Sequence, residues 1–386
     1  MRSLTESWYH AKKAYSLYPG VITPISGSFL AAHYARRRIE RGMGRRLLDA
    51  IVGVAFLAWI PIRARQVQKR FGLPLTWRAS ATAIARARFA DPNDIALFRI
   101  GDARDLDHYI RRFEDAGVNK RINPQAWSVQ CALADKIGFY DRCAEHGLRH
   151  PKVFATLRGP RVTLHSSPGE CPLLLKPARG EGGRGVQLLA PTAPQDETAF
   201  ARWLRGQVGR LRGDWLVQQR ILPHPNLAAL ALDALPTARM TTILNEQGEP
   251  ELVNAVLRFP SRSAIPVDNM KAGGLLSPVG LEDGSLGVAC RGYGGGDVIA
   301  HPVTGAVIAG RLLPDWPTAV ALVQLAHSRA FSDYTLIGWD VGFAADGPIL
   351  IEGNGKPGVL MPQRAGRRGL GDQRYGELLA FHLQRS

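Results

Sequence analysis

The alternating stretch 337–354 restricts the fold of this chain more than any other part of its sequence. Two apolar-rich runs flank Ala345, Asp346 and Gly347, which read as a three-residue hairpin loop with glycine in the left-handed position. Because side chains alternate between the two faces of a strand, this loop fixes which residues share a face. One face is apolar and belongs on a core: Trp339, Val341, Phe343, Ile349, Ile351 and Gly353.

The other face of this hairpin is polar. In the same register Asp340 lies opposite Glu352, and Gly338 lies opposite Asn354. Two opposed carboxylates have Cβ atoms roughly 5 Å apart and repel each other, and a divalent cation between them removes that cost. Carboxylate and amide oxygens are hard ligands that suit Mg²⁺ better than zinc. The hairpin therefore predicts a magnesium site, with two solvated carboxylates on an exposed sheet face as the alternative.

A second motif is rich in glycine and lies between two apolar runs that read as strands. Three of its residues fit the dinucleotide-binding pattern Gly-x-Gly-x-x-Gly: Gly180, Gly182 and Gly185. That pattern must open a helix, whereas here a strand follows. A glycine loop between strands can fold over phosphates, with backbone N–H groups as donors, and Lys176 before it supplies a cation. The motif predicts a phosphate-binding hairpin or an ordinary surface hairpin.

Length and composition describe a folded protein of two or three domains. The chain has 386 residues, of which 45% are hydrophobic and 21% are charged, ordinary values that exclude a disordered chain and a polytopic membrane protein. Four cysteines form no Cys-x-x-Cys pair, so neither a zinc site nor a disulfide scaffold is indicated. A reducing, cytoplasmic setting is expected.

The positive charge is concentrated at the N-terminus. Residues 1–90 carry 16 Lys/Arg and three Asp/Glu, most of the net charge of +16. Within them, arginines flank an apolar run from Leu47 to Ile62 that as a helix spans ~24 Å, short of the ~30 Å hydrocarbon core of a bilayer. The pattern in residues 36–70 is compatible with two structures, a buried core helix with solvated arginines at its ends and a helix lying in an anionic membrane surface. Nucleic-acid binding is not expected, because aromatic residues are not interleaved with the basic ones.

From residue 91 onward the pattern predicts an α+β chain dominated by antiparallel hairpins. Helical spacing covers 105–115 and 125–146, and Asp315 can cap a helix that runs to Phe331. Turn signals predict two further hairpins, whose strands are 239–245 with 251–259 and 297–301 with 306–310.

The glycine-rich hairpin and the Asp/Glu/Asn hairpin, in this order, resemble the ATP-grasp superfamily. The resemblance implies an ATP-grasp fold, in which two α+β subdomains grip ATP between antiparallel sheets. Together with the charge boundary it implies four segments: a basic helical N-terminal region (1–90), a helical segment (91–150), a lid subdomain (151–230) and a metal-binding C-terminal subdomain (231–386).

The resemblance also implies roles for individual residues. Lys136, at the start of a helix, is similar to the first ATP-binding lysine of the family, and Lys176 to the second. Further ATP-binding positions lie in the glycine loop and the adenine-binding hinge strand: Gly180, Gly182, Gly183, Gly185, Gln218, Gln219 and Ile221. The family often has an arginine shortly before the first metal-binding Asp, and here Arg239 supplies that charge from a neighbouring strand. Arg239 and Lys176 are the two expected catalytic residues. The implied ligands of two Mg²⁺ ions are Asp340, Glu352 and Asn354.

A narrower resemblance, to the sugar-transfer-associated ATP-grasp family, covers roughly residues 125–365. It is carried by short strings: His224-Pro225, Arg239–Thr242, Asn269–Gly274, His301–Gly305, Gly338–Asp340 and Glu352–Asn354. It implies an ATP- and Mg²⁺-dependent, ADP-forming ligase that joins a small carboxylate to an amine, thiol or sugar-linked acceptor through an acyl phosphate, in surface polysaccharide synthesis. The expected location is cytoplasmic, at the inner membrane face. Alternatives are a membrane-docked nucleotide-binding scaffold for glycosyltransferases and an ATP-grasp kinase that phosphorylates a hydroxyl.

Overall fold

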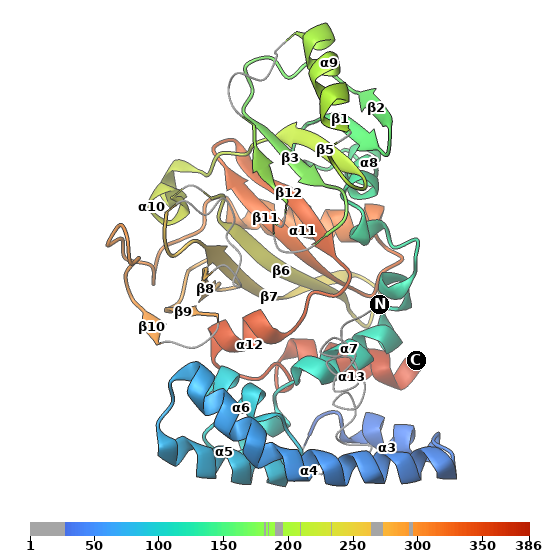
Figure 1. Cartoon of the computed structure of the whole chain (residues 1–386), viewed down its shortest axis with the longest axis vertical. Helices are drawn as coiled ribbons and strands as arrows, with labels where there is room; N and C mark the ends of the chain where they lie inside the picture. The colour runs from blue at the N-terminus through green and yellow to red at the C-terminus, as the bar shows by residue number, and fades with distance from the viewer. Residues whose placement is uncertain are drawn as a thin grey trace.

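The structure is a computed structural model of the whole chain. It describes residues 28–180, 183, 185–189, 196–208, 210–232, 234–263, 273–292 and 296–386. Along the longest axis, helices of the N-terminal region form one end, a seven-stranded sheet lies in the middle, and a five-stranded sheet forms the other end (Figure 1). All strand pairs in both sheets are antiparallel, which confirms the α+β expectation.

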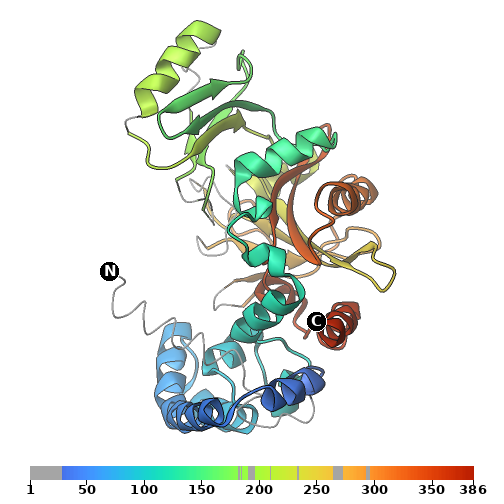
Figure 2. The same cartoon turned by 90° about the vertical axis from the view of Figure 1, so that its right-hand side faces the viewer.

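The N-terminal region is a layer of helices around its own small core. It contains α3 (Ala31–Ile39), α4 (Met43–Phe71), α5 (Leu75–Arg88) and α6 (Pro92–Phe98). Gly72 ends α4 in the left-handed conformation, with φ of +63°, and α5 and α6 pack against the C-terminal half of α4. Both views place α4 across the end of the molecule that is farthest from the five-stranded sheet (Figures 1 and 2).

The two helices predicted after residue 91 are displaced. Instead of one helix over 105–115, a 3₁₀ turn covers Ala103–Asp107 and α7 covers Arg112–Ile122. Instead of one helix over 125–146, two 3₁₀ turns cover Pro124–Trp127 and Ala132–Ala134, and α8 covers only Lys136–Glu145. The N-cap of α8 is Asp135, whose carboxylate accepts from the backbone N–H of Ile137 over 3.0 Å. This cap fixes Lys136 as the first residue of the helix.

The five-stranded sheet has the order β2-β1-β5-β3-β4. Its strands are β1 (Val153–Arg158), β2 (Arg161–Leu164), β3 (Leu173–Pro177), β4 (Gln187–Leu188) and β5 (Trp215–Gln219). One face is covered by α9 (Glu197–Val208), whose Phe200 and Leu204 pack against Leu175 and Val217. The two strands predicted around the glycine-rich loop are β3 and β4, and the expected hinge strand is β5; β1 and β2 were not predicted.

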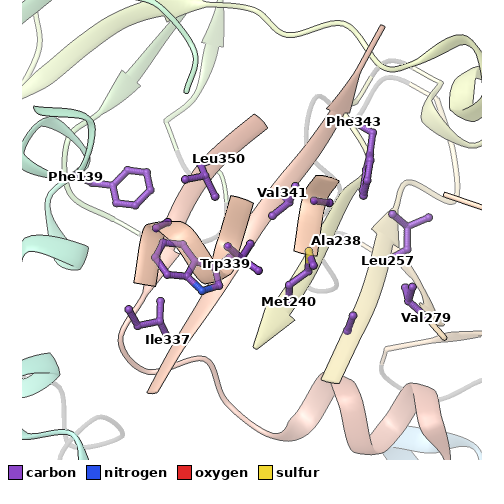
Figure 3. Packing of buried hydrophobic residues seen from close by; sticks show 14 of the residues in the cluster. Phe139, Ala238, Met240, Leu257, Val279, Ile337, Trp339, Val341, Phe343 and Leu350 are labelled. Atoms are coloured by element: carbon purple, nitrogen blue, oxygen red, sulfur yellow. The ribbon is translucent and has the colours of Figure 1, made fainter. Parts of the chain in front are cut away.

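The seven-stranded sheet has the order β10-β9-β8-β7-β6-β11-β12. Its strands are β6 (Thr237–Leu244), β7 (Pro250–Phe259), β8 (Leu275–Pro278), β9 (Ala289–Arg291), β10 (Asp297–Val298), β11 (Leu336–Ala344) and β12 (Gly347–Asn354). One face packs against α11 (Trp316–Ala330) and α8 to form the largest core. Figure 3 shows part of it, with Ile337, Trp339, Val341 and Phe343 following one another along β11.

The opposite face of this sheet is partly covered near the C-terminus. Helix α12 (Leu360–Gly366) packs Ala365 and Met361 against Val256, Leu276 and Cys290. The last helix, α13 (Arg374–Arg385), joins α3 and α7 in a second core at the edge toward the N-terminal region.

The β11–β12 hairpin pairs Asp340 with Glu352 as predicted, but the predicted loop is wrong. Ala344 pairs with Gly347, so only Ala345 and Asp346 form the turn. An irregularity between the pairs Val341–Leu350 and Asp340–Glu352 then inserts Ile351 as an extra residue, which restores the predicted register beyond it.

Because of this bulge, the predicted apolar face is wrong at Ile349 and Ile351. Val341, Phe343 and Leu350 lie in the large core, whereas Ile349 and Ile351 join a small apolar cluster with Ala344. A Cβ placed on Gly342 would meet Ile351 Cδ1 at 3.4 Å, so this cluster lies on the face of Gly342 and Asp340.

Two further expectations are only partly met. Asp297–Val298 pairs with β9 and not with 306–310. The remainder of that predicted hairpin forms a short antiparallel contact, in which Ala300 bridges Val307, the N–H of His301 donates to the oxygen of Ala306 over 2.9 Å and the N–H of Ile308 donates to the oxygen of Ile299 over 3.3 Å. Asp315 precedes α11 in the left-handed conformation, with φ of +49°, and its side chain makes no capping hydrogen bond.

Candidate active site

Strand β11 brings the predicted metal ligands and the predicted arginine together. Asp340 is in register with Arg239 of β6 on one side and with Glu352 of β12 on the other. Residues directly opposite one another in neighbouring strands point to the same face, so these three side chains form one row across the sheet. Asn354 pairs with Gly338 on the same face.

Asp340 is held between two arginines. Arg239 donates from Nε to Oδ1 over 2.5 Å, and Arg258 of β7 places Nη2 3.0 Å from Oδ2. Burial alone would raise the pKa of Asp340, but the charges of Arg239 and Arg258 outweigh it and hold the pKa below its usual range. Asp340 is therefore ionised and held in one orientation.

Glu352 faces the first predicted ATP-binding lysine. Lys136 places Nζ 3.3 Å from Glu352 Oε1 and donates to the backbone oxygen of Gly180 over 2.9 Å. The backbone N–H of Lys136 also donates to the oxygen of Ala178 over 2.9 Å. Lys136 therefore joins β12 of the large sheet to the start of the glycine-rich loop, which follows β3 of the small sheet.

Lys176, the second predicted lysine, is buried against Tyr140. Its Nζ donates to the Tyr140 hydroxyl over 2.8 Å and lies 4.9 Å from the ring centroid. The same hydroxyl donates to the backbone oxygen of Ile351 over 2.7 Å and lies 3.2 Å from Gln218 Oε1. Burial and the nearby charge of Lys136 lower the pKa of Lys176 to about 7, because a buried ammonium next to a second one is costly.

The charges of the described residues at this site do not balance. Among those residues, Lys136, Lys176 and Arg239 face two carboxylates, those of Asp340 and Glu352. The three cations are largely shielded from water: the side chains of Lys136 and Arg239 are 13% and 10% exposed, and Lys176 is 6% exposed. An excess of shielded positive charge is costly, and an anionic ligand would offset that cost.

Of the three residues predicted for the adenine-binding hinge strand, two lie on the Asp340 side and one on the opposite side of the small sheet. Ile221 packs with Leu235, Ala344, Ile349 and Ile351, the small apolar cluster on the Asp340 face. Gln218 reaches Tyr140 on the same side of β5. Alternation along the strand places Gln219 on the opposite face, toward α9. Of the hinge positions, Gln218 and Ile221 are thus brought to the site, and Gln219 is not.

The glycine-rich loop is described in part. Gly180, Gly183 and Gly185 have φ of +132°, +68° and +79°, conformations that favour glycine. Gly182, and residues 269–272 of the predicted string 269–274, lie outside the described residues.

The comparisons with known proteins agree with this arrangement. The family model described as sugar-transfer associated ATP-grasp matches residues 116–375, more than half of the chain. The chain belongs to this family. No curated protein matches it.

Solved structures similar to this ATP-grasp protein include three ligases. The L-amino acid ligase of Bacillus licheniformis is 15% identical, with 58% of this chain and 40% of that chain covered and a TM-score of 0.33. The D-alanine–D-alanine ligase of Bacillus anthracis, complexed with ATP, is 12% identical over 66% and 67% of the two chains, with a TM-score of 0.39. The D-alanyl-alanine synthetase A of Vibrio cholerae is 13% identical over 68% and 66%, with a TM-score of 0.40. These similarities are too weak to add to the family assignment.

The donor chemistry of the ATP-grasp site fits magnesium. Asp340, Glu352 and Asn354 offer hard oxygen ligands from two adjacent strands. The amide nitrogen of Asn354 is buried without a hydrogen-bond partner among the described residues, a cost that disappears if the amide turns and its oxygen meets a cation. Within the described ranges no group of three His, Cys, Asp or Glu side chains could hold a metal ion, so Asn354 is needed to complete the set.

The sequence analysis missed two residues of this site. Arg258 is the polar residue in the otherwise apolar end of β7, and its alternation with Leu257 could have placed it on the polar face. Tyr140 lies four residues after Lys136 and therefore on the same side of α8. That spacing was the available signal for Tyr140.

Gly338→Ala should lower both stability and turnover. A Cβ at this position would lie 2.5 Å from Pro357 Cβ and 3.2 Å from Arg239 Cδ, so Pro357 or Arg239 must move away from the Asp340 row. Overpacking of this kind costs about 1–3 kcal/mol. Urea unfolding and ATP turnover measure the two effects.

The matched control is Gly138→Ala in α8, where a Cβ meets nothing within 4 Å. Because alanine favours a helix interior, this change should stabilise by about 0.5–1 kcal/mol. Equal effects of the two substitutions would contradict the close packing at Gly338.

Proposed function

We propose that this protein is an ADP-forming ligase that joins a small carboxylate to an amine or thiol through an acyl phosphate. The observation that carries the proposal is the row of Asp340, Glu352 and Arg239, flanked by Lys136 of α8 and the buried Lys176 of β3. Such a site binds a magnesium nucleotide and places positive charge where a phosphoryl group is transferred.

In the first step a carboxylate oxygen of the substrate attacks the γ-phosphorus of ATP, and the bond to the β,γ-bridging oxygen breaks to release ADP. Lys176 and Lys136 supply cations for the phosphate oxygens. Asp340, Glu352 and Asn354 would hold magnesium, which would supply positive charge to the transferring group. Lys176, with a pKa lowered to about 7, gains its proton fully when the polyanion arrives.

Arg239 is the proposed catalytic arginine. Its guanidinium lies beside Asp340 in the row and places positive charge next to the proposed metal ligands. In the second step an amine or thiol attacks the acyl carbon, the carbon–oxygen bond to phosphate breaks, and free phosphate leaves. The family's association with sugar transfer favours a sugar-linked acceptor and a cytoplasmic role in surface polysaccharide synthesis.

Product analysis tests the reaction class. With uronic acids, amino acids and nucleotide sugars as candidate substrates, ADP and free phosphate should appear in equal amounts, and only when carboxylate and nucleophile are both present. With the carboxylate alone, hydroxylamine should trap a hydroxamate. ADP together with a stable phosphorylated hydroxyl would instead establish a kinase. Nucleotide binding without turnover on every substrate would favour the scaffold function.

A further inference from the structure

Helix α4 presents an apolar face to solvent over most of its length. Large apolar side chains recur along it every three or four residues, the spacing of one helix face, and those of Met43, Leu47, Ile51, Val54 and Ile62 are each between 58% and 80% exposed. With Ala58 between them they form the α4 stripe, which runs ~28 Å at ~1.5 Å per residue. A soluble helix normally puts charged and polar residues on such a face.

The stripe ends in positive charge. Arg65 and Lys69 continue the same three-and-four spacing after Ile62, and both are exposed. Residues 28–90 as a whole contain 13 Lys/Arg and two Asp/Glu. One of those acids, Asp49, is buried and paired with Arg41 and Arg45.

The opposite face of α4 is committed to the protein. Ile60 is fully buried among Ala81 and Ala85 of α5 and Ile95 of α6. By length and composition α4 could cross a membrane, and only 22% of its most apolar window is buried. A crossing would, however, separate Ile60 and Asp49 from their partners in the protein. The helix can therefore contact lipid on one side only.

From this geometry we propose that α4 lies in the plane of an anionic membrane, with the α4 stripe in the boundary between headgroups and acyl chains. An interfacial helix of this type inserts its apolar face and holds anionic headgroups with flanking arginines and lysines. Trp59 lies at the margin of the stripe, and the guanidinium carbon of Arg63 is 5.5 Å from the centroid of the Trp59 ring. Aromatic side chains at such a margin are typical of membrane interfaces. The ATP-grasp sheets then stand away from the membrane along the long axis of the molecule (Figure 1).

Vesicle co-sedimentation of the full chain tests this proposal. The wild type should bind vesicles made of an equal mixture of phosphatidylglycerol and phosphatidylcholine, and high salt should release it. It should bind vesicles of phosphatidylcholine alone poorly. The double variant Ile51→Glu/Val54→Glu should lower the apparent affinity ~10-fold or more. Arg65→Glu/Lys69→Glu should weaken binding to the anionic vesicles and leave the weak binding to phosphatidylcholine unchanged.

Ile299→Glu/Val307→Glu is the matched control. These side chains are 70% and 62% exposed, comparable to Ile51 and Val54, but lie beside the seven-stranded sheet, so this variant should bind vesicles like the wild type. Circular dichroism should give the same helix content for all variants, because every substituted side chain is exposed.

Three results would overturn the proposal. The first is a wild type that ignores anionic vesicles. The second is a solution dimer that Ile51→Glu/Val54→Glu converts to monomer while vesicle binding is unchanged, which would make the stripe a self-association surface. The third is resistance to extraction by alkaline carbonate, which would make α4 a spanning helix. The assay does not use ATP, so its outcome is independent of the reaction class.

Discussion

Asp340→Asn should abolish Mg²⁺-dependent turnover, with a fall in kcat of ~1000-fold or more. The same change should also lower the free energy of unfolding by about 3 kcal/mol, because it removes the carboxylate that pairs with the buried Arg239 guanidinium. The Arg239 side chain is only 10% exposed, so water cannot solvate its charge in place of Asp340. Urea unfolding and steady-state ADP release measure the two quantities.

Glu352→Gln separates the catalytic effect from the structural one. The Glu352 side chain is 24% exposed and its one ion pair among the described residues is with Lys136, so its loss should cost only about 1 kcal/mol of stability while turnover falls as steeply. Asp346→Asn, in the turn of the same hairpin, is the control: its side chain is 78% exposed, and both quantities should stay near those of the wild type. Full activity in Asp340→Asn would remove Asp340 from the metal site.

The β11–β12 hairpin illustrates how far sequence reasoning reached. Alternation placed Asp340 and Glu352 opposite each other, and the structure pairs them. The supporting geometry was nevertheless wrong twice, since the turn has two residues instead of three and Ile351 bulges. The two errors cancel at the site. A bulge depends on which side chain the core accepts, here Leu350, and a local pattern does not contain that information.

Residues that reach the site from a distance escaped the motifs. Arg258 meets Asp340 only because β7 lies beside β6, and sheet order is not encoded in the spacing of either residue. Tyr140 acquires its role from a lysine on β3 and a backbone oxygen on β12. Motif reasoning found the charged residues that belong to known patterns, and it missed the side chains that position them.

Helical spacing was least reliable in the N-terminal half. Apolar residues in 125–146 recur at helical intervals, yet the first part forms only short 3₁₀ turns, because the cap at Asp135 starts the helix at Lys136. The apolar run Leu47–Ile62 did indicate a helix, and among the described residues Ile60 of this run lies in a core while only 22% of the most apolar window of α4 is buried. Burial depends on tertiary partners, which amphipathic spacing alone does not identify.

Lys176→Met should have opposite effects on stability and on nucleotide binding. Lys176 is buried next to Lys136, and its pKa falls from 10.5 to about 7, so below pH 7 the folded protein bears the full cost of a buried ammonium. Methionine fills similar space without that charge. The nucleotide-free variant should therefore unfold at a higher urea concentration than the wild type, while its affinity for ATP should drop ~10-fold or more.

The pH dependence identifies the cause. Between pH 7 and 10.5 the unfolded chain keeps a proton that the folded chain has released, so the stability of the wild type rises with pH in this window, by on the order of 1 kcal/mol per pH unit. The advantage of Lys176→Met should accordingly be largest below pH 7 and shrink as the pH rises through the window. Lys152→Met, at an exposed position before β1, should show neither effect. A gain in stability that is the same at pH 6 and pH 10 would show that packing, and not charge burial, separates the variant from the wild type.

Calorimetry of Mg-ATP binding near pH 8 provides the complementary measurement: the wild type should take up a proton as Lys176 becomes charged, and Lys176→Met should take up none.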